Sequence, residues 1–184
     1  MADASETAVA PPRRDGPLAG ANHRALALTL AALVFALDQF SKWVVIEVLD
    51  LPNRRLFELL TFFDLRWVEN HGVSMGFLTA GSSVERWALV ALTAAIAMGV
   101  LIWLWREKNR GDAVALSFVL GGALGNIVDR SRYGYVADFA DLHFGEWRPF
   151  LIFNVADAAI TIGVLLLLFR ALLSRDGKTS RKEV

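Results

Sequence analysis

The 184-residue sequence has no cysteine and no formal net charge, and each absence excludes a class of function. Without cysteine, the chain can form no disulfide, use no thiolate as a nucleophile and carry no cysteine-linked lipid. A net charge of zero gives no electrostatic reason to expect binding to nucleic acid, which is drawn to excess positive charge. What the chain has in abundance is hydrophobic residues, at 55%. These are concentrated between two charged tails, which indicates a membrane protein.

Four apolar stretches are long enough to cross a bilayer, which takes about 20 residues. The predicted spans are residues 25–48, 87–105, 113–128 and 149–169. Trp87 and Trp105 flank the second stretch, as is typical of a spanning helix with aromatic residues at both interfaces. A cleavable signal peptide is the alternative for the first stretch, but no convincing small-residue cleavage site follows it. We therefore predict an all-α integral membrane protein with four transmembrane helices.

The charged residues predict three regions and an orientation. We expect residues 1–24 to be a disordered cytoplasmic tail, residues 25–173 to form the four-helix membrane domain, and residues 174–184 to be a second cytoplasmic tail. Basic residues gather in both tails and in the loop between spans two and three, at Arg13, Arg14, Arg24, Arg106, Lys108, Arg110, Arg170, Arg175, Lys178, Arg181 and Lys182. Because basic residues remain on the cytoplasmic side, both termini should be cytoplasmic and the loops after spans one and three should face outward.

The long outer loop, about residues 50–83, is predicted to contain a strand. From Phe63 to Val68, apolar and polar residues alternate with a period of two, as in a half-buried β-strand. Gly72 and Gly76 interrupt the pattern that follows. A small β-sheet on the outer surface of the membrane is therefore expected.

Ionisable residues inside spans are costly, so each needs a physical explanation. In the first span, Asp38 and Lys42 are four residues apart and share one helical face. They can form a structural ion pair, or they can support a polar site nearer the outer face. At the outer end of span three, Asn126, Asp129 and Arg130 also share one face. These are either interfacial charges at a helix end or a network that supports a site, and a buried amide such as Asn126 needs a partner.

Two acids near the outer ends of spans three and four are candidates for catalysis. Asn154 and Asp157 share a face at the start of span four, and no basic residue lies at helical spacing from Asp157. The connection before this span contains Asp138 and Asp141, and its shortness makes spans three and four antiparallel neighbours. Asp138 and Asp157 can then approach each other, and two carboxyl groups that share one proton can activate water. The alternative is that Asp138 is a solvated loop acid.

Four short blocks of the sequence occur in order along residues 25–173. The blocks are DQFSKW at residues 38–43, VENHGVSMGF at 68–77, GGALGNIVDR at 121–130 with Gly134, Val136, Asp138 and Phe139, and FNVADA at 153–158. Each block alone is a weak signal, but taken together they resemble the signal peptidase II family, the lipoprotein signal peptidases of bacteria. The chain departs from the family at Ser74 and Met75, where Ala-Phe is usual, which puts fine substrate or inhibitor contacts in question.

The resemblance implies an aspartic endopeptidase within the membrane that cleaves diacylglyceryl-modified prolipoproteins immediately before the lipidated cysteine. It implies Asp138 and Asp157 as the catalytic pair and no metal or organic cofactor. The positions assigned to substrate binding and support are Asp38, Lys42, Asn70, Gly72, Asn126, Asp129, Arg130 and Asn154. We expect a monomer in the bacterial inner membrane, in contact with lipid-modified prolipoproteins and membrane lipids, with its active site near the outer face.

Two other classes of protein would also place acids in a membrane. An ion- or proton-coupled transporter usually shows internal repeats and a site at the midplane, whereas this sequence has no visible repeat and most of its polar positions gather near the outer face. A non-enzymatic membrane scaffold would not require acids at both Asp138 and Asp157. The peptidase is therefore the favoured interpretation.

Overall fold

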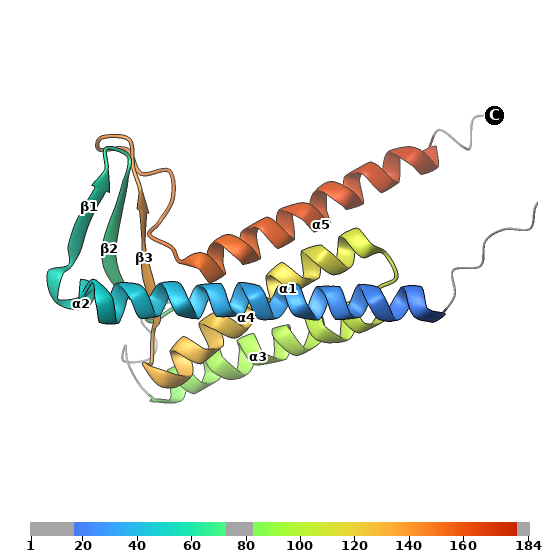
Figure 1. Ribbon diagram of the computed structural model, residues 1–184, viewed down its shortest axis with the longest axis horizontal. Coiled ribbons are helices and arrows are strands. Elements are labelled where there is room, and N and C mark those ends of the chain that lie inside the picture. The colour runs from blue at the N-terminus through green and yellow to red at the C-terminus, as the bar shows by residue number, and fades with distance from the viewer. Residues whose placement is uncertain (1–16, 73–82, 180–184) are drawn as a thin grey trace, which may run out of the picture.

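The computed structural model describes residues 17–72 and 83–179, in which a bundle of four long helices carries a small sheet at one end (Figure 1). Between the first long helix and the sheet lie a π-helical turn, η1, and a short helix, α2. The prediction of a four-helix membrane protein with a small β-sheet is confirmed. The elements are α1 (Pro17–Trp43), η1 (Val44–Val48), α2 (Leu51–Arg54), β1 (Leu56–Leu60), β2 (Phe63–Asn70), α3 (Ser83–Arg106), α4 (Arg110–Arg132), β3 (Val136–Leu142) and α5 (Val155–Thr179).

Four segments of the described chain have the length and apolar composition to cross a membrane: His23–Val48, Ser83–Arg106, Arg110–Arg132 and Val155–Leu173. Their outward faces carry large apolar side chains, among them Leu33, Ile96 and Leu165, each more than half exposed in the protein alone. Such surfaces are unfavourable in water but are suited to lipid. In Figure 1, α1 begins and α5 ends at the end of the bundle opposite the sheet.

The ends of two helices differ from the sequence prediction. Helix α1 begins at Pro17, inside the region predicted to be a disordered tail, and α5 continues to Thr179, past the predicted end of the membrane domain. The prediction that the fourth span begins at Pro149 is wrong as a helix boundary, because α5 begins at Val155. Hydropathy does not distinguish a helix from an extended apolar segment, and Phe153 instead bridges to Ala140 of β3.

Helix α4 lies in the middle of the bundle and packs against α1, α3 and α5. Close approach depends on glycine: a Cβ atom at Gly121 would lie 2.5 Å from the carbonyl oxygen of Ala31 in α1, and one at Gly122 would lie 2.5 Å from that of Ala156 in α5. Such close helix contacts are typical of packing in lipid. The same glycines bring α1 and α5 close to α4, beside its polar residues.

The sheet has the strand order β1-β2-β3, and both pairs are antiparallel. The strand predicted from Phe63 is confirmed as β2, whereas the sequence analysis did not predict β1 or β3. In the register of β2 with β3, Val68 pairs with Asp138 and Asn70 pairs with Val136. Buried apolar side chains join the sheet to η1 and to α2: Val45, Leu51, Leu65, Trp67, Ala137, Phe139 and Ala140. This cluster fixes β3, and therefore the backbone of Asp138, at the end of the bundle that carries the sheet.

Candidate active site

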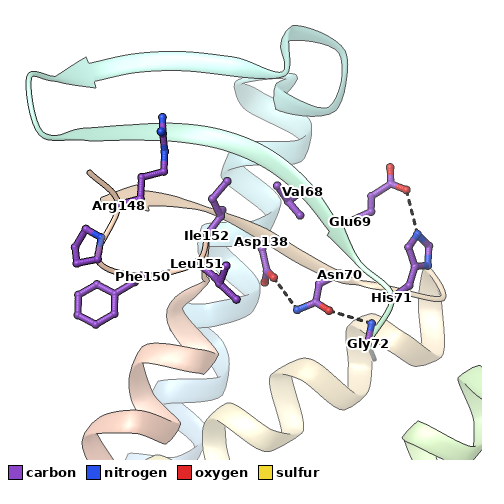
Figure 2. Close-up of a pocket in the computed structure, with 11 residues that line it drawn as sticks. Val68, Glu69, Asn70, His71, Gly72, Asp138, Arg148, Phe150, Leu151 and Ile152 are labelled. Carbon is purple, nitrogen blue, oxygen red and sulfur yellow. Dashed lines mark hydrogen bonds and ion pairs between the residues drawn. The ribbon is translucent and has the colours of Figure 1, made fainter. Parts of the chain in front are cut away.

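Asp138 lies on β3 and is 2% exposed, so it is not a solvated loop acid. Both of its carboxyl oxygens accept hydrogen bonds from amides. Asn70 Nδ2 donates to Oδ2 at 2.9 Å, and Asn154 Nδ2 donates to Oδ1 at 2.7 Å. Asn70 is itself fixed, because its Oδ1 accepts from the backbone nitrogen of Gly72 at 3.0 Å (Figure 2). Gly72 has φ +92°, a conformation that favours glycine, so the sequence-predicted Asn70 and Gly72 act together in orienting Asp138.

The surroundings of Asp138 favour its protonated form. Burial raises the pKa of Asp138 to about 6, and the negative charge of Asp157 acts in the same direction. The hydrogen bonds from Asn70 and Asn154 stabilise the ionised form and oppose this rise. The carboxyl group can therefore gain or lose a proton near neutral pH, as a general acid or base requires.

The raised pKa predicts how stability depends on pH. Because the folded pKa of about 6 lies above the ordinary aspartate pKa of 3.8, the unfolded chain releases this proton first, and stability falls as pH rises through that window. Asp138→Asn removes this loss, so the variant should gain about 2–3 kcal/mol over the wild type between pH 4 and pH 7. Reversible unfolding in mixed detergent micelles would measure the difference. A difference that does not change with pH would contradict the raised pKa.

Asp157 lies in the first turn of α5, where a capping box holds it. Asn154 precedes the helix, and its Oδ1 accepts from the Asp157 backbone nitrogen at 2.9 Å. In return, Asp157 Oδ2 accepts from the Asn154 backbone nitrogen at 3.4 Å. This reciprocal pattern satisfies amide groups that a helix start otherwise leaves unpaired. Asn126 Nδ2 on α4 donates to the other oxygen, Asp157 Oδ1, at 2.8 Å, so the carboxyl group has a defined orientation.

A single side chain therefore joins the two predicted catalytic acids. Asn154 contacts Asp138 through its amide nitrogen and the backbone of Asp157 through its amide oxygen. The same amide nitrogen lies 3.3 Å from Asn126 Oδ1. Asn154 is fully buried and Asn126 is 8% exposed. The structure thus brings Asp138, Asp157, Asn126 and Asn154 into one hydrogen-bonded group.

Lys42 contacts this group through Asn126 and forms ion pairs with two further acids, Asp38 and Asp129. Its Nζ atom is 2.8 Å from Asp38 Oδ2 and 2.7 Å from Asp129 Oδ2, and it donates to Asn126 Oδ1 at 3.4 Å. The ion pair considered for Asp38 and Lys42 is present, with Asp129 as a second partner that sequence spacing did not indicate. Asp38 Oδ1 also accepts from the backbone nitrogen of Ala156 at 2.9 Å, which ties α1 to the first turn of α5.

The sequence analysis missed Gln39, which bonds to both of the acids that pair with Lys42. Its Nε2 atom donates to Asp38 Oδ2 at 3.2 Å and to Asp129 Oδ1 at 3.1 Å. Asp129 Oδ2 also accepts from the backbone nitrogen of Ala137 at 3.2 Å, which anchors the start of β3. The only signal for Gln39 in the sequence is its position directly after Asp38.

Arg130 is half-buried and lies within electrostatic range of Asp157, Asp138 and Asp129. Its Nε atom is buried and has no hydrogen-bond partner within the described chain. A buried donor without a partner is unfavourable, unless a bound molecule supplies an acceptor. Arg130 can therefore offer a hydrogen bond to a carbonyl group placed beside the two acids.

The two acids open into different cavities. Asp138 lines a cavity of about 760 Å³ between the end of β2 and residues 148–152. Asp157 lines a more apolar cavity of about 290 Å³ at the start of α5. Phe150 and Leu151 line both cavities and so divide them. Ser74 and Met75, where the sequence departs from the family pattern, lie outside the described residues. Within residues 17–72 and 83–179, no group of three or more His, Cys, Asp or Glu side chains could hold a metal ion.

Known proteins match this chain over most of its length. The chain is 62% identical to the lipoprotein signal peptidase of Rhizorhabdus wittichii over 162 residues, which cover 88% of this chain and 94% of that relative. It is 56% identical to the lipoprotein signal peptidase of Sphingopyxis alaskensis over 146 residues, covering 79% of this chain and 84% of the relative.

The fold agrees with these relatives. Two solved structures of a bacterial membrane enzyme, both obtained by the in meso method, superpose with TM-scores of 0.68 and 0.70 at 28% identity. They cover 87% and 80% of this chain, and 94% and 93% of their own chains. The family model described as signal peptidase (SPase) II matches residues 30–173, which include every residue of the site described above. The chain therefore belongs to the signal peptidase II family.

Proposed function

We propose that this chain is an intramembrane aspartic endopeptidase that removes the signal peptide from diacylglyceryl-modified prolipoproteins by cutting before the lipidated cysteine. Membership of the signal peptidase II family supports a protease, and the relatives named lipoprotein signal peptidase support the substrate class. The observation that carries the aspartic mechanism is the position of Asp138 and Asp157. Asn154 joins them, and each borders a cavity large enough for part of a substrate.

In the proposed reaction, the two acids share one proton and act on one water molecule. The ionised carboxylate takes a proton from water, and the water oxygen bonds to the carbonyl carbon of the scissile peptide. The protonated acid donates to the carbonyl oxygen, which gives a neutral tetrahedral intermediate. The carbon–nitrogen bond then breaks: the leaving amine takes up the proton that the first carboxylate removed, and a hydroxyl group of the intermediate returns a proton to the second acid as the new carboxyl group forms. Because the acids interact, their protons titrate as properties of the pair.

The remaining polar residues are proposed to position this pair and the substrate. Asn126 and Asn154 orient the carboxyl groups, and Arg130 is suited to bind a backbone carbonyl of the substrate. Lys42 and Asp38 hold the first turn of α5 against α1. All of these groups come from one chain, so the proposed active species is a monomer surrounded by membrane lipid.

Cleavage of a lipidated substrate by the purified enzyme tests this function. The enzyme in lipid vesicles would be given one prolipoprotein with the diacylglyceryl group and the same protein without it, and the products would be identified by mass. The proposal expects one cut, directly before the modified cysteine, in the lipidated protein only. Efficient cutting of the unlipidated protein, or cutting at another bond, would contradict the proposed substrate class.

The proposed orientation gives a separate prediction. With both termini in the cytoplasm, the β1–β2 turn is on the outer side of the inner membrane and the α3–α4 loop is on the cytoplasmic side. Because the chain has no cysteine, Thr61→Cys and Lys108→Cys each introduce a single exposed thiol. In intact cells, a membrane-impermeant thiol reagent should label the variant at residue 61 and spare the one at residue 108. The reverse pattern would overturn the orientation.

A further inference from the structure

The cavity beside Asp138 carries opposite charges at its two ends (Figure 2). Arg148 lies at one end, and Glu69 with His71 lies at the other, while Asp138 and Asn70 lie between them. The Nε2 atom of His71 is 3.7 Å from a carboxylate oxygen of Glu69. An extended molecule that crosses this cavity would therefore meet Asp138 near its middle and a fixed cation at one end.

Arg148 is held in place by a buried acid. Its Nε atom lies 3.2 Å and 3.3 Å from the two carboxylate oxygens of Asp141, which is fully buried. The Nε atom of Arg66 lies 3.0 Å from Asp141 Oδ2. Of these two guanidinium groups, the one that lines the cavity is that of Arg148. The Arg148 side chain is 41% exposed, so its remaining N–H groups can reach a ligand.

The position of the cavity indicates which part of a substrate would occupy it. It is formed by β2, β3 and residues 148–152, all of which lie outside the four candidate membrane spans. The cavity beside Asp157 differs, because Thr161 and Ile162 contribute to it from within the fourth span. A signal peptide and a diacylglyceryl group are apolar and suit the membrane side. The polypeptide that follows the cleaved bond is outside the membrane and suits the charged cavity.

We propose that the cavity beside Asp138 receives the first few residues after the cleaved bond, and that Arg148 makes the enzyme prefer acidic over basic side chains there. This inference rests on the proposed function and adds a specificity-determining residue to it. A guanidinium group already fixed on Asp141 loses little side-chain freedom when it binds a second carboxylate. A lysine at the same substrate position would instead meet a like charge.

Paired substrates test the proposal. Two lipidated prolipoproteins would differ only in carrying Asp or Lys at the second and third positions after the cut, and the enzyme would be embedded in vesicles of neutral lipid. The wild type should show a kcat/KM about 3- to 10-fold higher for the Asp substrate. Arg148→Gln should bring the ratio close to one, and Arg148→Lys should retain most of it. Higher salt should reduce the wild-type ratio, because part of the effect comes from exposed charges.

Arg66→Gln is the matched control. Arg66 contacts the same carboxylate of Asp141 but does not line the cavity, so its variant should keep the wild-type ratio. Three results would overturn the proposal: a wild type without preference, an Arg148→Gln enzyme that keeps the preference, or an Arg66→Gln enzyme that loses it equally. Failure of the wild type to cut either lipidated substrate would instead contradict the proposed function, and the preference would fall with it.

Discussion

Replacing either Asp138 or Asp157 with asparagine is expected to slow cleavage of a lipidated prolipoprotein by at least about a thousandfold. An amide has nearly the same shape as a carboxyl group but neither takes a proton from water nor donates one to the leaving amine. Because the two acids act as a unit, the double variant should be little worse than either single variant. Single-turnover cleavage by purified protein measures the loss without interference from product release.

Asp64→Asn is the matched control for this experiment. Asp64 is also a buried acid of the sheet, but it lies near the opposite end of β2 from Asn70, where its carboxylate is 3.0 Å from His143. Its variant should cleave at close to the wild-type rate. Near wild-type cleavage by either variant of the proposed pair would show that its acid is not catalytic. An equal loss in Asp64→Asn would show that cleavage is sensitive to any buried acid of the sheet.

Lys42→Met is expected to be the most destabilising of the substitutions considered. It removes the only charge within ion-pair distance of Asp38 in the described chain and a partner of Asp129, two carboxyl groups that are almost fully buried. Removing one partner of a buried ion pair costs about 3–5 kcal/mol, because the remaining charge has neither water nor a counter-ion. The yield of folded protein in membranes and unfolding in mixed micelles would both report this loss.

Arg170→Met provides the comparison. Arg170 of α5 pairs with Asp112 of α4 at 2.5 Å, but both side chains are about a third exposed. An exposed pair of this kind contributes about 1 kcal/mol or less. Adding Asp38→Asn to Lys42→Met should restore part of the lost stability, since it removes one unpaired charge. A Lys42→Met protein as stable as Arg170→Met would contradict the central role of the buried lysine.

Features that depend on local sequence were predictable. The four spans follow from length and hydropathy, and the strand at Phe63 follows from its alternation. Asp157 was singled out because an acid one turn into an apolar span has no local partner.

Features that depend on contacts between distant segments were not predictable. Asp129 shares Lys42 with Asp38, although the two acids lie on different helices and are far apart in sequence. Strand β3 is buried over most of its length and shows no alternation, so the position of Asp138 needed the family resemblance. The sequence predicts helix for the extended segment before α5, because its apolar residues fit either structure.

The first turn of α5 limits how this protein could be redesigned. Asp157 is both a proposed catalytic acid and one half of the cap that begins the helix, and the same turn is tied to α1 through Asp38. Any change that shifts or rotates α5 to enlarge the site would therefore displace the acid and unpair the cap. Phe150 and Leu151, which border both cavities and carry no part of that cap, are the positions at which new substrate preferences can be introduced without disturbing the acids.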